Sequence, residues 1–125
     1  MTYMLDTSAC IELLRGNSPP DYLEGQQCEI SAIVEGELWA GVHHKGGTKE
    51  EKKVRLLLDA VSVIPFDSAS AQTTGKLLGH FARKGIKIGD FDTQIAAHAI
   101  QTEATLVTCN LKHFKQVPEL QLKAW

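Results

Sequence analysis

Residues 90–108 read DFDTQIAAHAIQTEATLVT, and this stretch predicts a helix followed directly by a strand. Asp90 is expected to cap a helix that runs to about Thr102, because an aspartate side chain accepts hydrogen bonds from the free N–H groups of a first helical turn. The β-branched run Thr105–Thr108 is typical of a strand. A helix that leads into a short strand is the repeating unit of parallel sheets, so the stretch indicates an α/β fold.

Similar signals alternate along the rest of the chain. Further strands are predicted at the apolar runs 3–5, 28–31, 61–64 and 120–122. Helices are expected to be capped at Thr7 or Ser8, at Ser31, at Thr48 with Glu51 as its capping-box partner, and at Asp67. The helix that begins at Asp67 is expected to end at Lys84, before Gly85. Strands separated by helices imply right-handed crossovers, so we expect one domain over residues 1–125 with a mostly parallel central sheet flanked by helices.

Length and charge narrow the class of protein. The 125 residues suffice for one domain with its own core. Because 13 Lys and Arg stand against 15 Asp and Glu, for a net charge of −2, nucleic acid cannot be held by bulk positive charge and any contact needs local basic patches. No apolar run is long enough for a bilayer, no secretion signal is recognisable and the 3 cysteines lack CxxC spacing, so we expect a cytoplasmic protein with reduced thiols.

Asp92 is the most informative single residue. At about 100° per residue it shares one helical stripe with Ile95, Ala96 and Ala99, so a carboxylate stands in the middle of an apolar face. Burying an ionised carboxylate without compensation costs several kcal/mol. Asp92 therefore needs a partner, a cation or a raised pKa, unless it is only a first-turn residue favoured by the helix dipole.

Acidic residues also follow two of the predicted strands. Asp6 comes directly after residues 3–5, where it could also be a helix cap. Glu35 and Glu37 are two positions apart, about 200° around a helix, so only one of them can face a common site, and periodicity leaves the choice open. Because the carboxyl ends of parallel strands meet at one edge of a sheet, Asp6, one glutamate and Asp92 can converge there.

Three converging carboxylates would require a cation. Two unit charges about 5 Å apart repel by roughly 3 kcal/mol at an effective dielectric constant of 20, and three carboxylates make three such pairs. Ligand sets made only of oxygen favour Mg²⁺ or Mn²⁺ over zinc. Such an ion lowers the pKa of an attacking water and neutralises a phosphate, which suits phosphodiester hydrolysis.

Several motifs occur in order along the chain. They are Leu5-Asp6-Thr7-Ser8, Glu37-Leu38 followed by Gly41, Ile88-Gly89 with Asp92 and Ile95-Ala96-Ala97-His98-Ala99, Val107-Thr108-Cys109-Asn110 followed by Phe114, and Val117-Pro118 with Trp125. This ordered set resembles the PIN-domain ribonucleases, and most closely the VapC-type toxins of bacterial toxin–antitoxin pairs. The resemblance covers nearly the whole chain and implies a PIN-like α/β/α sandwich.

The resemblance also implies an activity. It implies a Mg²⁺- or Mn²⁺-dependent endoribonuclease toxin that cleaves RNA, with tRNA or rRNA as the expected substrate, and thereby arrests translation. It further implies a homodimer that is inhibited by a small cognate antitoxin. The alternatives are a PIN-type nuclease of housekeeping RNA processing and a non-catalytic PIN-like interaction module. The carboxylate of Asp92 on an apolar face argues against the interaction module, which would not need it.

The matching positions suggest which residues act. The catalytic, metal-binding acids correspond to Asp6, Glu37 and Asp92, because the pattern Glu-Leu-x-x-Gly selects Glu37 over its neighbour. Asn110 occupies the family's fourth position and, as an uncharged amide, is expected to orient a water or a carboxylate. The supporting residues are completed by the hydroxyls of Thr7 and Thr108 and by Asp90, which either adds a carboxylate to the rim or only caps its helix.

Basic residues near the acids are candidates for contacts with RNA phosphates. Arg83, Lys84 and Lys87 precede the Asp92 helix, and Lys112 follows Asn110, although solvated helix ends are an equal alternative. The histidines show no metal-ligand spacing and are expected to be solvated or packed; they are His43, His44, His80, His98 and His113.

Overall fold

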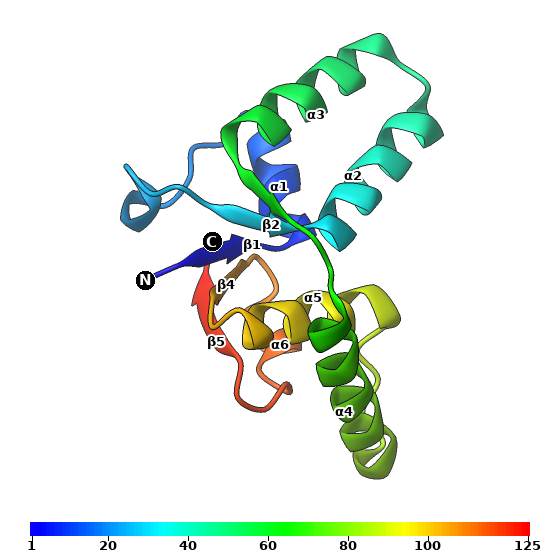
Figure 1. Ribbon diagram of the computed structural model, residues 1–125. Helices are drawn as coiled ribbons and strands as arrows, with labels where there is room; N and C mark the ends of the chain where they lie inside the picture. Colours follow the sequence, from blue (N-terminus) through cyan, green and yellow to red (C-terminus); the bar gives the residue numbers. More distant parts are fainter.

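Five parallel strands form the central sheet of the computed structural model, which describes residues 1–125 (Figure 1). The strands are β1 (Tyr3–Leu5), β2 (Glu29–Ser31), β3 (Ser62–Ile64), β4 (Thr105–Thr108) and β5 (Gln121–Ala124). Their order is β3-β2-β1-β4-β5, so the direction of sheet growth reverses between β1 and β4. At such a reversal the carboxyl ends of the strands leave a crevice in which α/β proteins bind ligands.

Helices cover both faces of this sheet. They are α1 (Thr7–Leu14), α2 (Ala32–Lys45), α3 (Thr48–Ala60), α4 (Ser68–Lys84), α5 (Asp90–Gln101) and α6 (Leu111–Phe114), with a 3₁₀ turn η1 (Asp21–Leu23). Figure 1 shows α1, α2 and α3 on one face and α4, α5 and α6 on the other. The predicted single α/β/α domain with a parallel sheet is thus confirmed. None of these helices has the length and apolar composition needed to cross a membrane.

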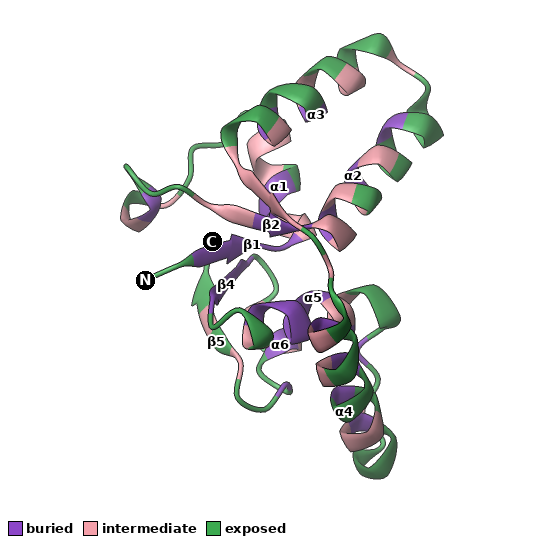
Figure 2. Ribbon diagram, in the orientation of Figure 1, coloured by how far each residue is buried: buried purple, intermediate pink, exposed green.

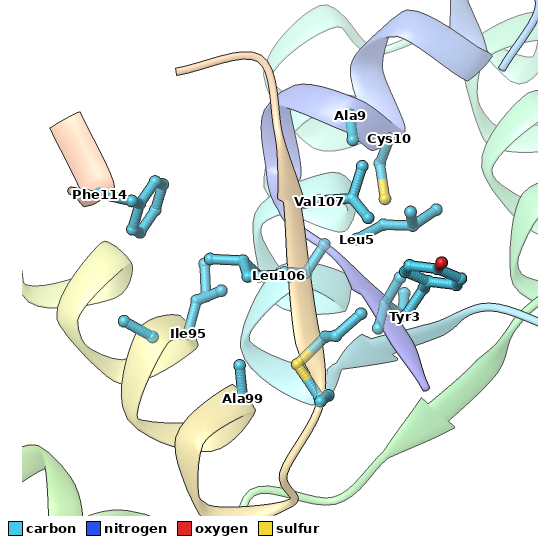
Figure 3. Packing of buried hydrophobic residues seen from close by; sticks show 14 of the residues in the cluster. Tyr3, Leu5, Ala9, Cys10, Ile95, Ala99, Leu106, Val107 and Phe114 are labelled. Atoms are coloured by element: carbon cyan, nitrogen blue, oxygen red, sulfur yellow. The ribbon is translucent and has the colours of Figure 1, made fainter. Parts of the chain in front are cut away.

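The core lies around the two central strands. β1 and β4 are buried along their whole length, whereas the edge strand β5 is largely exposed (Figure 2). Ile95 and Ala99 of α5 pack toward Leu106 of β4, while Val107 of the same strand turns toward Cys10 of α1 (Figure 3). Because successive side chains of a strand point to opposite faces, β4 joins the two helical layers.

Three predicted helix starts differ in the structure. Asp6, rather than Thr7 or Ser8, caps α1, and the sequence could not choose among three consecutive residues that all have capping side chains. Gly47 takes the cap position of α3, so Thr48 begins that helix and forms no capping box. Glu51 instead pairs with Arg55 one turn further along.

The prediction that Asp90 caps α5 is also wrong. Gly89 is the cap residue, with a φ of 101° that an L-residue rarely adopts, and Asp90 is the first helical residue. The caps at Ser31 and Asp67 are confirmed, as is the end of α4 before Gly85. Strands β2 and β3 each begin one residue later than predicted, and the last strand extends to Ala124.

Candidate active site

Asp6 lies at the carboxyl end of β1, and both of its carboxylate oxygens accept hydrogen bonds. Oδ1 accepts from the Ser8 hydroxyl at 2.6 Å and from the Ala9 N–H at 2.9 Å. Oδ2 accepts from the Thr108 hydroxyl at 2.5 Å. The residue is only 4% exposed, so these three donors replace the water that the carboxylate loses on burial.

The two hydroxyls that hold Asp6 are themselves oriented by backbone groups of the segment after β4. Ser8 Oγ accepts from the Cys109 N–H at 3.0 Å, and Thr108 Oγ1 accepts from the Asn110 N–H at 3.0 Å. A hydroxyl that accepts from the backbone can direct its one proton to the carboxylate. Asn110 itself is exposed at this edge, and its side chain forms no hydrogen bond within the protein.

Helix α2 brings Glu37 to the same site. Thr7 Oγ1, one residue after Asp6, donates to Glu37 Oε1 at 2.7 Å. Burial raises the pKa of Glu37, the Thr7 hydrogen bond opposes this rise, and the charges of Asp92 and Asp6 add to it. Glu35, in contrast, accepts from the indole N–H of Trp39 at 3.1 Å. Of the two glutamates between which periodicity could not choose, Glu37 is therefore the one that faces the other acids.

Asp92, in the first turn of α5, is half-buried and has a side-chain partner. His113 Nε2 of α6 lies 3.1 Å from Asp92 Oδ2. Burial raises the pKa of Asp92, the hydrogen bond and the charge of His113 oppose this rise, and Asp6 adds to it. Sequence reasoning missed this histidine, which was expected to be solvated or packed. Its place three residues after Asn110, on the segment that follows β4, was the available signal.

The remaining candidate residues lie outside this hydrogen-bonded set. Asp90 is exposed and forms no hydrogen bond or ion pair. Arg83 and Lys84 belong to the last turn of α4, whose end projects away from the sheet (Figure 1), and Lys87 is exposed in the loop that follows. Lys112 is exposed on α6, the helix that also carries His113.

Two cavities reach Glu37. One, of about 300 Å³ between α1, α2 and α3, is lined by Thr7, by the cations Arg15, Lys45 and Lys53, and by the acid Glu50. The other, of about 430 Å³, is lined by Phe91 and by small residues of α2, namely Ala32, Gly36 and Ala40. The sequence did not identify the cations of the first cavity, because they come from three separate places: the end of α1 at Arg15, the helix α2 at Lys45 and the helix α3 at Lys53.

The donor set fits a hard divalent cation in its chemistry. Oε2 of Glu37 and Oδ1 of Asp92 have no hydrogen-bond partner in the protein, so each can turn to a ligand. No three His, Cys, Asp or Glu side chains lie close enough together to hold an ion as they stand. Beyond the larger effect of burial, the charge of Asp6 helps to raise the pKa of both Glu37 and Asp92, so these carboxylates repel and a cation would offset the repulsion. Oxygen donors of this kind suit Mg²⁺ or Mn²⁺.

Comparisons with known proteins identify the family. The model of the PIN domain matches residues 3–120. Ribonuclease VapC2 of Rickettsia felis is 36% identical over 100% of this chain and 98% of its own length. The tRNA(fMet)-specific endonuclease VapC of Salmonella typhimurium is 30% identical, again over 100% and 98%. The crystal structure of VapBC2 from Rickettsia felis, bound to a DNA fragment from its promoter, matches with a TM-score of 0.89 at 36% identity and covers 100% of this chain and 99% of that one. The chain therefore belongs to the PIN-domain family and, within it, to the VapC ribonucleases.

Proposed function

We propose that this protein is an endoribonuclease toxin that depends on Mg²⁺ or Mn²⁺ and arrests translation by hydrolysing phosphodiester bonds of tRNA or rRNA. The observation that carries the proposal is the set of hydrogen bonds that hold Asp6, Glu37 and Asp92 around the carboxyl ends of β1 and β4. Burial, and after it the charges of neighbouring acids, raise the pKa of Glu37 and Asp92 there. The family supports it, since one relative is a ribonuclease by name and another a tRNA(fMet)-specific endonuclease.

The three acids are the proposed ligands of the cation. When bound there, a divalent ion supplies Lewis-acid chemistry, which lowers the pKa of the attacking water and offsets the charge of the phosphodiester. Thr7 and Thr108 fix the orientation of Glu37 and Asp6 through their hydroxyl hydrogen bonds.

Two further side chains border this site. The exposed amide of Asn110 is free to orient a water or a carboxylate beside the three acids. Asp90, exposed at the start of α5, is the proposed further carboxylate of the acidic rim.

The RNA backbone is expected to follow the cations beside the acids. Arg15, Lys45 and Lys53 line the cavity that begins at Thr7 and Glu37, and they offer the local positive charge that a chain of net charge −2 needs for phosphate binding. Among the other basic candidates, Lys112 is the one that follows Asn110 by only two residues in the sequence. The cations Arg83, Lys84 and Lys87 would reach only a longer RNA.

We propose a VapB-like antitoxin as the natural inhibitor, because the solved relatives from Rickettsia felis and Haemophilus influenzae are VapBC complexes.

We also propose a homodimer. Phe91 is 59% exposed beside the small residues of α2, and an exposed apolar surface of this kind suits a second copy. The three free cysteines, Cys10, Cys28 and Cys109, fit the reducing cytoplasm, where the RNA substrate is also found.

Cleavage of total tRNA and rRNA by the purified protein tests the function. We expect cutting with Mg²⁺ or Mn²⁺, no cutting with EDTA and no cutting by Asp6→Asn. The matched control is Asp59→Asn, which changes an exposed aspartate of α3 that has no hydrogen-bond or ion-pair partner and should retain full activity. Cleavage that persists in EDTA and in Asp6→Asn would contradict the metal mechanism.

A further inference from the structure

Asp92 differs from the other two acids of the candidate active site in its side-chain partner. Asp6 and Glu37 accept from hydroxyl groups, whereas Asp92 accepts from the imidazole of His113 at 3.1 Å. The side chains of His113 and Asp92 are 23% and 38% exposed, so the contact is partly shielded from water. No other hydrogen bond reaches the Asp92 carboxylate.

The position of His113 is fixed by its neighbours in the chain. Phe114 and Val117 are 1% and 5% exposed, and they anchor α6 and the following turn in the core. Figure 3 shows Phe114 on the side of the sheet that α5 occupies. Gln116 Nε2 donates to the His113 carbonyl at 3.1 Å. Because core packing holds the backbone of His113, its imidazole is preorganised beside Asp92 and is not brought there by the hydrogen bond alone.

The chemistry of the pair determines where the proton lies. An ionised carboxylate can only accept, so Nε2 carries the proton and donates it to Asp92 Oδ2. A ring nitrogen that carries a proton is not a metal ligand, and Nδ1 of His113 forms no hydrogen bond or ion pair with another acid. The geometry therefore favours a histidine that acts through the carboxylate over one that would itself bind an ion.

We propose that His113 is a positioning residue that holds Asp92 by Oδ2 and thereby leaves Oδ1 as the oxygen available to a divalent cation. This inference rests on the proposed function, since it gives Asp92 a cation to bind. It also predicts a preference among cations. A carboxylate held by one oxygen binds through the other, which suits the small octahedral ions Mg²⁺ and Mn²⁺ better than Ca²⁺, which also accepts carboxylates through both oxygens.

Binding of Mn²⁺ and Ca²⁺ without RNA, measured by calorimetry, tests the inference. The variants are His113→Gln, whose amide N–H can still reach Asp92, and His113→Asn and His113→Ala, which cannot. His44→Ala is the matched control, because His44 is exposed near the end of α2 and has no hydrogen-bond partner. Thermal unfolding of each variant in EDTA reports whether it folds, and the Gln and Asn pair keeps the comparison valid if His113→Ala does not.

Loss of the partner of a metal-binding carboxylate typically weakens metal binding by about 10- to 100-fold. We expect a loss of this size for Mn²⁺ in His113→Asn and His113→Ala, a smaller loss for Ca²⁺, and affinities close to wild type in His113→Gln and His44→Ala. Long-range ¹H–¹⁵N spectra of the histidine rings should show that Nε2 of His113 keeps its proton when Mg²⁺ binds.

Three outcomes would overturn the inference, and they separate it from the proposed function. Unchanged Mn²⁺ affinity in His113→Asn and His113→Ala, with binding lost in Asp6→Asn, would reject the role of His113 and leave the nuclease site intact. Equal loss in His113→Gln and His113→Ala, with Nε2 deprotonated on binding, would make His113 itself a ligand. Absence of Mn²⁺ binding in the wild type would reject the metal site and this inference together.

Discussion

The Thr108 hydroxyl donates a 2.5 Å hydrogen bond to Asp6 Oδ2 and thereby joins two residues that are 102 positions apart in the sequence. The two side chains stand at the ends of β4 and β1, the neighbouring strands between which the sheet order reverses. The bond lies inside the protein, where Asp6 is 4% exposed and Thr108 is fully buried. The same contact therefore joins the two central strands at their carboxyl ends and orients a proposed metal ligand.

Replacement of Thr108 by valine should be costly for stability. The variant keeps the shape of the side chain but removes the donor to a buried carboxylate, and hydrogen bonds to charged groups contribute about 1.5–3 kcal/mol. We expect the free energy of unfolding in urea to fall by about that amount. Thr108→Ser retains the hydroxyl and is expected to stay much closer to wild type. Equal stability of the valine variant and the wild type would show that the bond contributes nothing.

Replacement of Asp92 by asparagine should abolish RNA cleavage and leave the fold intact. The amide fills the same space and no longer repels Glu37 or Asp6, so no loss of thermal stability is expected in EDTA. The measurements are cleavage of total tRNA and rRNA, and thermal unfolding followed by circular dichroism. Asp59→Asn serves as the control for the same chemical change at an exposed site. Full cleavage by Asp92→Asn would exclude this carboxylate from the reaction.

The raised pKa values of Glu37 and Asp92 predict how stability depends on pH without metal. Their ordinary values are 4.5 and 3.8, and the folded protein holds these protons to higher pH than the unfolded chain does. Stability that these groups contribute is therefore present at acidic pH and is lost as the pH rises through the raised values. In urea unfolding with EDTA, Glu37→Gln should gain stability relative to wild type as the pH rises toward neutrality.

Addition of Mn²⁺ at neutral pH is expected to reverse this loss in the wild type. An ion that binds only the folded state stabilises it by mass action, so the melting temperature should rise with Mn²⁺ concentration. Glu37→Gln lacks one of the proposed ligands and should respond less. A melting temperature that Mn²⁺ leaves unchanged in the wild type would speak against ion binding by the three acids.

His98 predicts a second pH effect, of opposite sign. It is 1% exposed, and its Nδ1 lies 2.8 Å from Ser31 Oγ, which also accepts from the Ile33 N–H at 3.1 Å. Ser31 can donate its one proton to Nδ1 when the ring is neutral. Burial lowers the pKa of His98 below its ordinary 6.5, and the charge of Asp67 opposes this.

Because the unfolded chain binds this proton more readily than the folded protein, stability should fall as the pH drops below 6.5 toward the lowered pKa. Urea unfolding between about pH 8 and about pH 5 measures the effect. A His98→Gln variant, which cannot titrate, should lose this part of the pH dependence, whereas His44→Gln at an exposed position should keep it. Identical pH profiles of wild type and His98→Gln would disprove the assignment.

Local pattern was sufficient for most elements of the fold. The β-branched run Thr105–Thr108 and the capping residue Asp67 each marked the element that the structure contains. Periodicity also placed Asp92 on the apolar face of α5 and so predicted that it needs a partner. Predicted element starts differ from the structure where several residues compete for the cap, as at Asp6, or where a glycine takes it, as at Gly89.

The sequence by itself therefore determined the parallel α/β sandwich and, through its resemblance to a family, predicted which three acids form the site. Only the tertiary structure decided how those acids are held. The hydrogen bonds Thr7–Glu37, His113–Asp92 and Thr108–Asp6 span 30, 21 and 102 residues. The periods of helices and strands show which face a side chain occupies, but they carry no information about residues so far apart. Those partners meet only because the strand order places β1 beside β4 and packs the helices around their carboxyl ends.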